Sequence, residues 1–289
     1  MASVRVLFST GALYGLPLTL SLRLAARAGC DGVEMVLDPL TILAGPQRAK
    51  RLAEREGVDI AALHPSLFGL PGWTKQPLAF RRLGRYALGL DCPLIVVHPP
   101  RFENLASRMA EFERGIEALK ETTADRVQVT VENVAVFGKA GRQHPYTQPA
   151  NVAELAEVHG LGLTFDTTHA VSADLPVIAA YESVAHLVRH VHLSDFRLPH
   201  PLLDRPSWDT YFKHHRLPGD GEADLRSFLR RLRRRGYRGA VTLELSPVAI
   251  HAWHPRKATE LVRRSVDYVR EAWESASERV VAPSAVLGV

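Results

Sequence analysis

The sequence predicts a single (β/α)₈ TIM barrel. Short apolar runs rich in β-branched residues alternate with longer amphipathic stretches along all 289 residues, a pattern typical of parallel strands joined by crossover helices. Eight runs of each kind can be traced, which is what closing such a barrel requires. No linker or change of composition separates a second domain. We therefore expect one barrel over residues 1–275 and a C-terminal tail over residues 276–289, where helical periodicity is lost.

The expected strands are apolar, and many of their residues are β-branched. They are VRVLFS from Val4, GVEMVL from Gly32, IAALHP from Ile60, LIVVHP from Leu94, QVTVEN from Gln128, LGLTFDTTH from Leu161, RHVHLSD from Arg189 and AVTLELS from Ala240. The expected helices cover residues 17–28, 46–56, 77–90, 104–123, 149–158, 175–187, 222–235 and 256–275. An open doubly wound sheet is the alternative, but its usual glycine-rich phosphate fingerprint after the first strand is missing.

The composition indicates a globular protein, because 46% of the residues are hydrophobic and 23% are charged. The two cysteines, Cys30 and Cys92, form neither a metal-type pair nor a disulfide framework. Gly15 and Pro17 interrupt the apolar start of the chain, which argues against a signal peptide. No run approaches the roughly 18 apolar residues of a membrane span. We expect a cytoplasmic protein with no membrane partner.

The net charge of +5 raises the question of nucleic acid binding. Much of the positive charge lies on and just after one expected helix, in Arg226, Arg230, Arg231, Arg233, Arg234, Arg235 and Arg238. A barrel helix runs back toward the N-terminal ends of the strands, away from the face that carries active sites. We therefore expect a solvated or partner-facing helix and no nucleic acid partner.

Residues of metal-ligand type stand at the ends of the third to eighth expected strands. They are His64, His98, Glu132, Asp166, His192 and Glu244, the first four at intervals of 34 residues. Buried carboxylates and imidazoles are costly unless they are paired or coordinated, and a cation compensates all of them at once. The sequence therefore predicts a site for one divalent ion. Two Glu, one Asp and one His suit Mn²⁺, Co²⁺, Zn²⁺ or Mg²⁺.

Alternation along the strands predicts which side chains face inward. Residues two positions before the ligand types should line the barrel interior: Ala62, Val96, Thr130, Thr164, His190 and Thr242. Their neighbours should point outward beneath the helices: Val131, Phe165, Val191 and Leu243. We interpret His190 as interior packing or as support below His192.

Seven short motifs give the chain a resemblance to a known superfamily. They are GCDGVEM at Gly29, VVHPP at Val96, TVENVA at Thr130, FDTTHA at Phe165, HVHLSD at His190, LPGDGEADL at Leu217 and TLELS at Thr242. In their order and spacing the chain resembles the xylose-isomerase-like TIM barrel superfamily. That group contains sugar isomerases and epimerases, inosose-processing enzymes and zinc apurinic endonucleases.

The isomerase branch implies a metal held by Glu132, Asp166, His192 and Glu244. The ion would polarise a substrate carbonyl, and Glu132 and Glu244 would act as acid and base on the two faces of an enediolate. By the same resemblance Glu34, at the end of the second strand, and His169 would hydrogen-bond substrate hydroxyls. We also assign to substrate binding His64, His98, Arg197 and His215, together with Trp73, which lies in a long loop where its ring could stack on a sugar. Gly138 and Leu198 replace a substrate-binding Glu and Arg of the ketose epimerases, which argues against a ketohexose substrate. We prefer a non-phosphorylated keto-sugar, polyol or cyclitol.

The nuclease branch is the alternative. Its additional metal-binding histidines match His64, His98 and His169, which would imply up to three zinc ions acting on a phosphodiester. A carboxylate that the branch also requires is replaced by Lys213. The sequence leaves the number of ions open, and also whether the protein forms a homo-oligomer.

Overall fold

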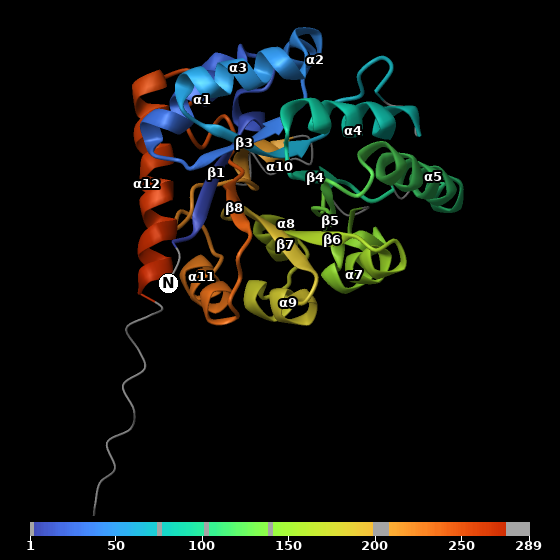
Figure 1. Cartoon of the computed structure of the whole chain (residues 1–289). Coiled ribbons are helices and arrows are strands. Elements are labelled where there is room, and N and C mark those ends of the chain that lie inside the picture. Colours follow the sequence, from blue (N-terminus) through green and yellow to red (C-terminus); the bar gives the residue numbers. More distant parts are fainter. Residues whose placement is uncertain (1–2, 74–76, 101–103, 138–140, 199–207, 276–289) are drawn as a thin grey trace, which may run out of the picture.

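The computed structural model describes residues 3–73, 77–100, 104–137, 141–198 and 208–275. Eight parallel strands form one closed barrel in chain order (Figure 1). They are β1 (Arg5–Ser9), β2 (Gly32–Val36), β3 (Asp59–His64), β4 (Leu94–Val97), β5 (Gln128–Glu132), β6 (Gly162–Asp166), β7 (Val188–Leu193) and β8 (Ala240–Leu243). The predicted single (β/α)₈ barrel is confirmed. The predicted tail, 276–289, lies outside the described residues.

Eight longer helices surround the barrel, as expected from the sequence. They are α1 (Leu18–Ala28), α3 (Pro46–Glu56), α4 (Leu78–Leu90), α5 (Leu105–Thr123), α7 (Pro149–Val158), α9 (Val177–Val184), α11 (Leu225–Arg234) and α12 (Pro255–Glu274). The long helix α12 closes the ring between α1 and α11 (Figure 1). Among the described residues, no helix is long and apolar enough to span a membrane.

Several short helices were not predicted. They are η1 (Thr10–Leu13), α2 (Pro39–Ala44), η2 (Pro145–Thr147), α8 (Thr167–Ser172) and α10 (Asp209–Phe212). β6 ends at Asp166, where a ligand was expected at a strand end, but the expected run from Leu161 to His169 was too long, because α8 begins directly after Asp166. The Asp166 carboxylate accepts a hydrogen bond from the His169 backbone N–H at 2.7 Å and so caps this helix.

The predicted alternation of inward and outward side chains is present. Ala62 and Val96 pack with Leu7 in a small apolar cluster inside the barrel. Outward residues such as Phe165 belong to the large core between barrel and helices, where the Phe165 ring lies 5.7 Å from that of Phe228 on α11. The lower barrel is thus filled with side chains, which leaves the strand ends as the place for polar chemistry.

Asp195, two residues beyond the end of β7, organises the loop that precedes α11. Its carboxylate is buried, and within the part of the chain that the structure describes its hydrogen bonds come from backbone groups. It accepts four hydrogen bonds of 2.8–3.0 Å, from the N–H groups of Phe196, Gly219, Gly221 and Ala223. This contact explains the sequence motif LPGDGEADL, since a Cβ on Gly221 would lie 2.4 Å from Asp195 Oδ1.

We expect Asp195→Ala to lower the free energy of unfolding by about 3 kcal/mol, because four N–H groups, one buried and three partly buried, lose their acceptor. Urea denaturation followed by circular dichroism measures this loss. Asp220→Ala is the matched control, since Asp220 lies in the same loop and is exposed. Equal stability of the two variants would contradict the role given to Asp195.

Candidate metal centre

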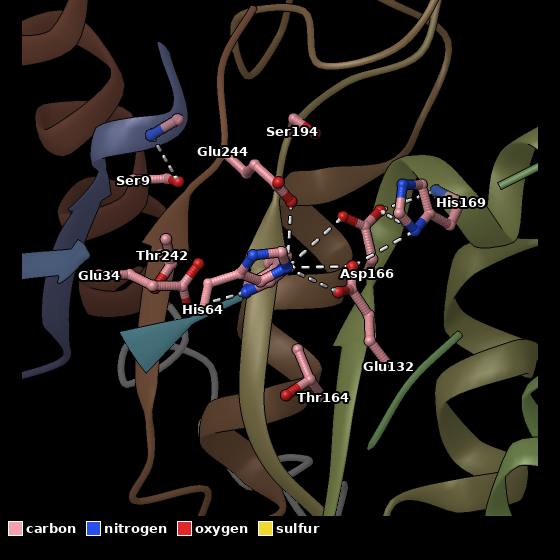
Figure 2. Close-up of polar contacts among 12 residues, drawn as sticks. Ser9, Glu34, His64, Glu132, Thr164, Asp166, His169, Ser194, Thr242 and Glu244 are labelled. Carbon is pink, nitrogen blue, oxygen red and sulfur yellow. Dashed lines mark hydrogen bonds and ion pairs between the residues drawn. The ribbon is translucent and has the colours of Figure 1, made fainter. Parts of the chain in front are cut away.

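Four predicted ligands come together because parallel strands end at the same rim of a barrel. Glu132 is the last residue of β5 and Asp166 the last of β6, His192 lies near the end of β7, and Glu244 directly follows β8. Figure 2 shows the carboxyl groups of Glu132, Asp166 and Glu244 directed toward one region from three sides. One potential ligand atom from each of the four residues lies within 4.8 Å of the others.

The imidazole of His192 lies at the centre of this cluster. Its Nδ1 atom is 3.1 Å from Glu132 Oε1, 3.0 Å from Glu244 Oε2 and 3.9 Å from Asp166 Oδ2. Among the described residues, the buried atoms Glu132 Oε2, Asp166 Oδ2 and Glu244 Oε2 accept no hydrogen bond. Glu244 Oε2 and Glu132 Oε2 lie 3.0 and 3.2 Å from the nitrogens of His192 and His98 without the geometry of a hydrogen bond. Buried carboxylate oxygens normally have a partner, so a cation would satisfy oxygens that these side chains leave unsatisfied.

The electrostatics of the cluster favour a cation. Burial, together with Glu244 and Glu132, raises the pKa of Asp166 well above its ordinary value. Burial also acts to raise the pKa of Glu132, but the neighbouring His192, His64 and His98 together outweigh it and lower that pKa. Three crowded carboxylates cannot all be ionised at low cost without positive charge between them. Their oxygens and one imidazole nitrogen form a donor set that fits a divalent ion such as Mn²⁺, Co²⁺, Zn²⁺ or Mg²⁺.

Asn133, which the sequence analysis did not single out, holds Asp166 in place. Its side-chain amide accepts from the Asp166 N–H at 2.9 Å and donates to the Asp166 carbonyl at 3.1 Å. Its own carbonyl lies 2.7 Å from His169 Nδ1. Its position directly after Glu132 could have indicated this role, because a side chain there can reach the adjacent strand.

The structure brings His64 and His98 to the Glu132 side of the cluster. His98 Nε2 lies 3.2 Å from Glu132 Oε2, and His64 Nε2 lies 3.7 Å from it. The two Nε2 atoms are 3.2 Å apart. His64 is buried, whereas the side chain of His98 is 44% exposed. His98 is therefore the more accessible of the pair to a bound molecule.

His169 and His215 lie near Asp166, and His169 Nδ1 is also 3.3 Å from Glu132 Oε1. Their ring centroids are 5.5 Å apart, and with Asp166 they form another group of possible ligands. Burial lowers the pKa of His169 to about 4, so this imidazole is neutral near pH 7. His215 is held by a 3.3 Å contact of its Nδ1 with Ser194 Oγ.

Glu34 has a different environment from the one expected. We predicted a carboxylate at the end of the second strand that binds substrate hydroxyls, but Glu34 lies inside β2 and is 0% exposed. Its Oε2 atom accepts hydrogen bonds from His190 and His192, both at 2.9 Å. In the barrel register Glu34 pairs with Ala62, two residues before His64, which places it one layer below the ligands.

Trp73 and Arg197 are not gathered into the cluster. The Trp73 ring packs against Tyr86 of α4, with centroids 6.4 Å apart, and Arg197 is exposed. No hydrogen bond, ion pair or ring contact among the described residues joins either of them to the four predicted ligands. Their assignment to substrate binding stays a prediction.

Residues 22–272 match the sequence profile of the xylose isomerase-like TIM barrel. The chain belongs to this family. The match covers seven of the eight strands, β2 to β8, and all four predicted ligands. The resemblance carried by the sequence motifs is thereby confirmed.

Proteins that are similar to this chain have differing chemistries. The chain is 27% identical over 264 residues to a 3-dehydroshikimate dehydratase of Pseudomonas aeruginosa, covering 85% of this chain but only 39% of the dehydratase. A 3-keto-D-glucoside 4-epimerase from E. coli has the same fold, with a TM-score of 0.68, 16% identity, and coverage of 93% of this chain and 99% of that one. A D-tagatose 3-epimerase-like protein gives a TM-score of 0.66, 21% identity, and coverage of 94% and 100%.

Proposed function

We propose that this protein is a divalent-metal-dependent isomerase or epimerase that acts on a small polyhydroxylated carbonyl compound, such as a keto-sugar, an oxidised polyol or a cyclitol. The observation that carries the proposal is the convergence of Glu132, Asp166, Glu244 and His192, with three carboxylate oxygens that accept no hydrogen bond among the described residues. These residues would hold the ion. When bound, the ion would supply Lewis-acid polarisation of the substrate carbonyl, which acidifies the neighbouring C–H.

The exposure of Glu132 and Glu244 indicates which of them acts as the base and which as the acid. The Glu244 side chain is 18% exposed, whereas that of Glu132 is 1% exposed. Glu244 is therefore the better placed to take a proton from a substrate carbon and give an enediolate. Glu132 would protonate the other face of the enediolate with a proton of its own, and exchange of protons with water would restore both glutamates for the next turnover. The accessible His98, together with His169 and His215, would hydrogen-bond substrate hydroxyls.

The same first step would serve a dehydratase. Removal of a proton beside a carbonyl can be followed by reprotonation, which gives an isomer or epimer. It can also be followed by loss of a hydroxide from the next carbon, which gives an unsaturated product and water. The similarity to a 3-dehydroshikimate dehydratase therefore makes cyclic hydroxyketones suitable test substrates alongside keto-sugars.

A zinc-dependent phosphoesterase of the apurinic endonuclease type is the second candidate. Two further ligand groups favour it: His64, His98 and Glu132 on one side, and Asp166, His169 and His215 on the other. Lys213 opposes it, because the third site would gain a positive charge where that chemistry needs a carboxylate. The number of bound ions separates the candidates, since an in-line phosphoryl displacement typically uses two or more.

We expect about one tightly bound divalent ion per chain after purification, because one group of four ligands is complete. Elemental analysis of protein dialysed against metal-free buffer gives this ratio. Anomalous scattering from crystals would then locate the ion. Two or three ions at full occupancy would favour the phosphoesterase.

Replacing Arg231, Arg234 and Arg235 by Ser should leave turnover and metal content unchanged. Arg231 and Arg235 form ion pairs with Glu182 on α9, and α11 ends at Arg234, shortly before β8 begins at Ala240 at the opposite end of the barrel from the metal centre. The measurement is turnover on the best substrate, with binding of an abasic oligonucleotide as a second readout. A steep loss of either would show that this helix takes part in function.

A further inference from the structure

The layer directly below the proposed metal ligands contains a second polar group. Glu34 of β2, His190 of β7 and Thr242 of β8 all face the barrel interior. His190 Nε2 lies 2.9 Å from Glu34 Oε2 and 2.9 Å from Thr242 Oγ1. In Figure 2, Glu34 and Thr242 lie on the side of the cluster away from Asp166 and His169. This group is too deeply buried to meet a substrate.

His192 connects the two layers through its two ring nitrogens. Nε2 lies 2.9 Å from Glu34 Oε2, and Nδ1 faces the carboxylates of Glu132 and Glu244 at 3.1 and 3.0 Å. An ionised carboxylate can only accept a hydrogen bond, so the nitrogen beside Glu34 carries the proton. When His192 is neutral, this leaves the lone pair on Nδ1, the atom that faces the metal ligands.

The charge of Glu34 is explained by its histidine partners. The described residues give its Oε2 two donors, His190 and His192, while its Oε1 accepts no hydrogen bond. A buried carboxylate persists in this setting only where it has such donors. A Glu at a position that merely fills the barrel interior would bring a large desolvation cost that an apolar residue avoids. Its burial against a ligand therefore points to a role in ligation.

We propose that Glu34 is a positioning residue for the metal centre: by accepting the Nε2 proton of His192, it fixes the ring orientation and the tautomer that presents Nδ1 to the ion. A carboxylate behind a ligating imidazole also makes the ligand a stronger base. The inference rests on the proposed metal site and adds to it a residue outside the four ligands.

The test compares Co²⁺ binding by the full-length wild type, Glu34→Gln, Glu34→Asp and Thr242→Val. Apoprotein is prepared with a chelator, Co²⁺ affinity is measured by competition with a chromophoric chelator, and the visible spectrum of the Co²⁺ form is recorded. Thr242→Val is the matched control, because the Thr242 side chain belongs to the same layer and contacts His190, and among the described residues its hydroxyl makes no hydrogen bond with the His192 side chain. Thermal unfolding of each apoprotein reports the fold independently of the metal.

We expect Glu34→Gln to weaken Co²⁺ binding on the order of ten- to a hundredfold and to shift the visible bands. The reason is that a Gln amide group turned toward His192 moves the ring proton to Nδ1, where it competes with the ion. Glu34→Asp should also bind more weakly, because its carboxylate is withdrawn by one methylene group. Thr242→Val should match the wild type, and apoprotein Glu34→Gln should melt close to wild-type apoprotein.

Wild-type Co²⁺ affinity and spectrum in Glu34→Gln would overturn the proposal. So would a loss of affinity that is matched by Thr242→Val, since it would reflect general damage to the layer. If Glu34→Gln does not fold, Glu34→Asp decides by the same comparison. If the wild type itself binds no Co²⁺, the proposed metal site is wrong. If the wild type and both Glu34 variants all bind Co²⁺ equally well, the metal site stands and only the role of Glu34 is wrong.

Discussion

Glu132→Gln and Asp166→Asn should each weaken divalent metal binding by more than about a hundredfold, since loss of a direct ligand exceeds the ten- to hundredfold effect usual for outer contacts. Each substitution keeps the shape of the side chain but removes a negative charge from a buried cluster. Asp166→Asn also leaves the contacts of the Asp166 backbone with Asn133 intact. The loss of affinity therefore reports ligation more than folding.

Elemental analysis after dialysis and competition titration with a chelator measure these losses. Glu182→Gln is the matched control, because Glu182 pairs with Arg231 and Arg235 on the outside of the barrel. It should retain the metal content of the wild type. Full metal content in both Glu132→Gln and Asp166→Asn would place the ion elsewhere.

Product formed in deuterated water should carry deuterium on carbon, and Glu244→Gln should reduce its formation about 10²- to 10⁴-fold. The physical reason is that isomerisation and epimerisation remove a proton from carbon and return one, whereas hydrolysis leaves carbon-bound hydrogens in place. The metal-loaded protein would be incubated with keto-sugars, inososes and cyclic hydroxyketones. Nuclear magnetic resonance and mass spectrometry would then detect the exchange.

Two controls make the deuterium experiment decisive. Glu244→Gln must still be folded and must be tested at a metal concentration that saturates it, so that loss of the base is separated from loss of the ion. An oligonucleotide with an abasic site is incubated in parallel. Cleavage of the abasic strand, with no deuterium exchange and no product from any carbonyl compound, would contradict the proposed isomerase function and favour the phosphoesterase.

The sequence was sufficient for the barrel because its periodicities are local. Alternating β-branched runs and amphipathic segments are visible in any window of the chain, and parallel strands must end at a common rim. The approach of Glu132, Asp166 and His192 to one another follows from that topology, although they are far apart in the chain. The helix α8 was missed because its start depends on a side-chain cap from Asp166 within an apolar run typical of strands.

Supporting contacts could not be predicted from local patterns. Asn133 holds Asp166 only because β5 and β6 are adjacent in a particular register. Trp73 is typical of a sugar-stacking residue in a loop, yet its ring packs against Tyr86. The roles of Asn133 and Trp73 both depend on a residue that is distant in the sequence, and the local sequence around each of them does not reveal that contact.

Taken alone, the sequence determined the barrel and the chemical types of side chain at its rim, because strand direction and alternation fix both. The tertiary structure decided the depth of each side chain. Glu34 illustrates the difference, since the register between β2 and β3 shifts between Val33 and Glu34. That irregularity helps to set Glu34 opposite Ala62, below the rim, where it binds His192. A register shift depends on how two strands pack against each other, and neither strand encodes it by itself.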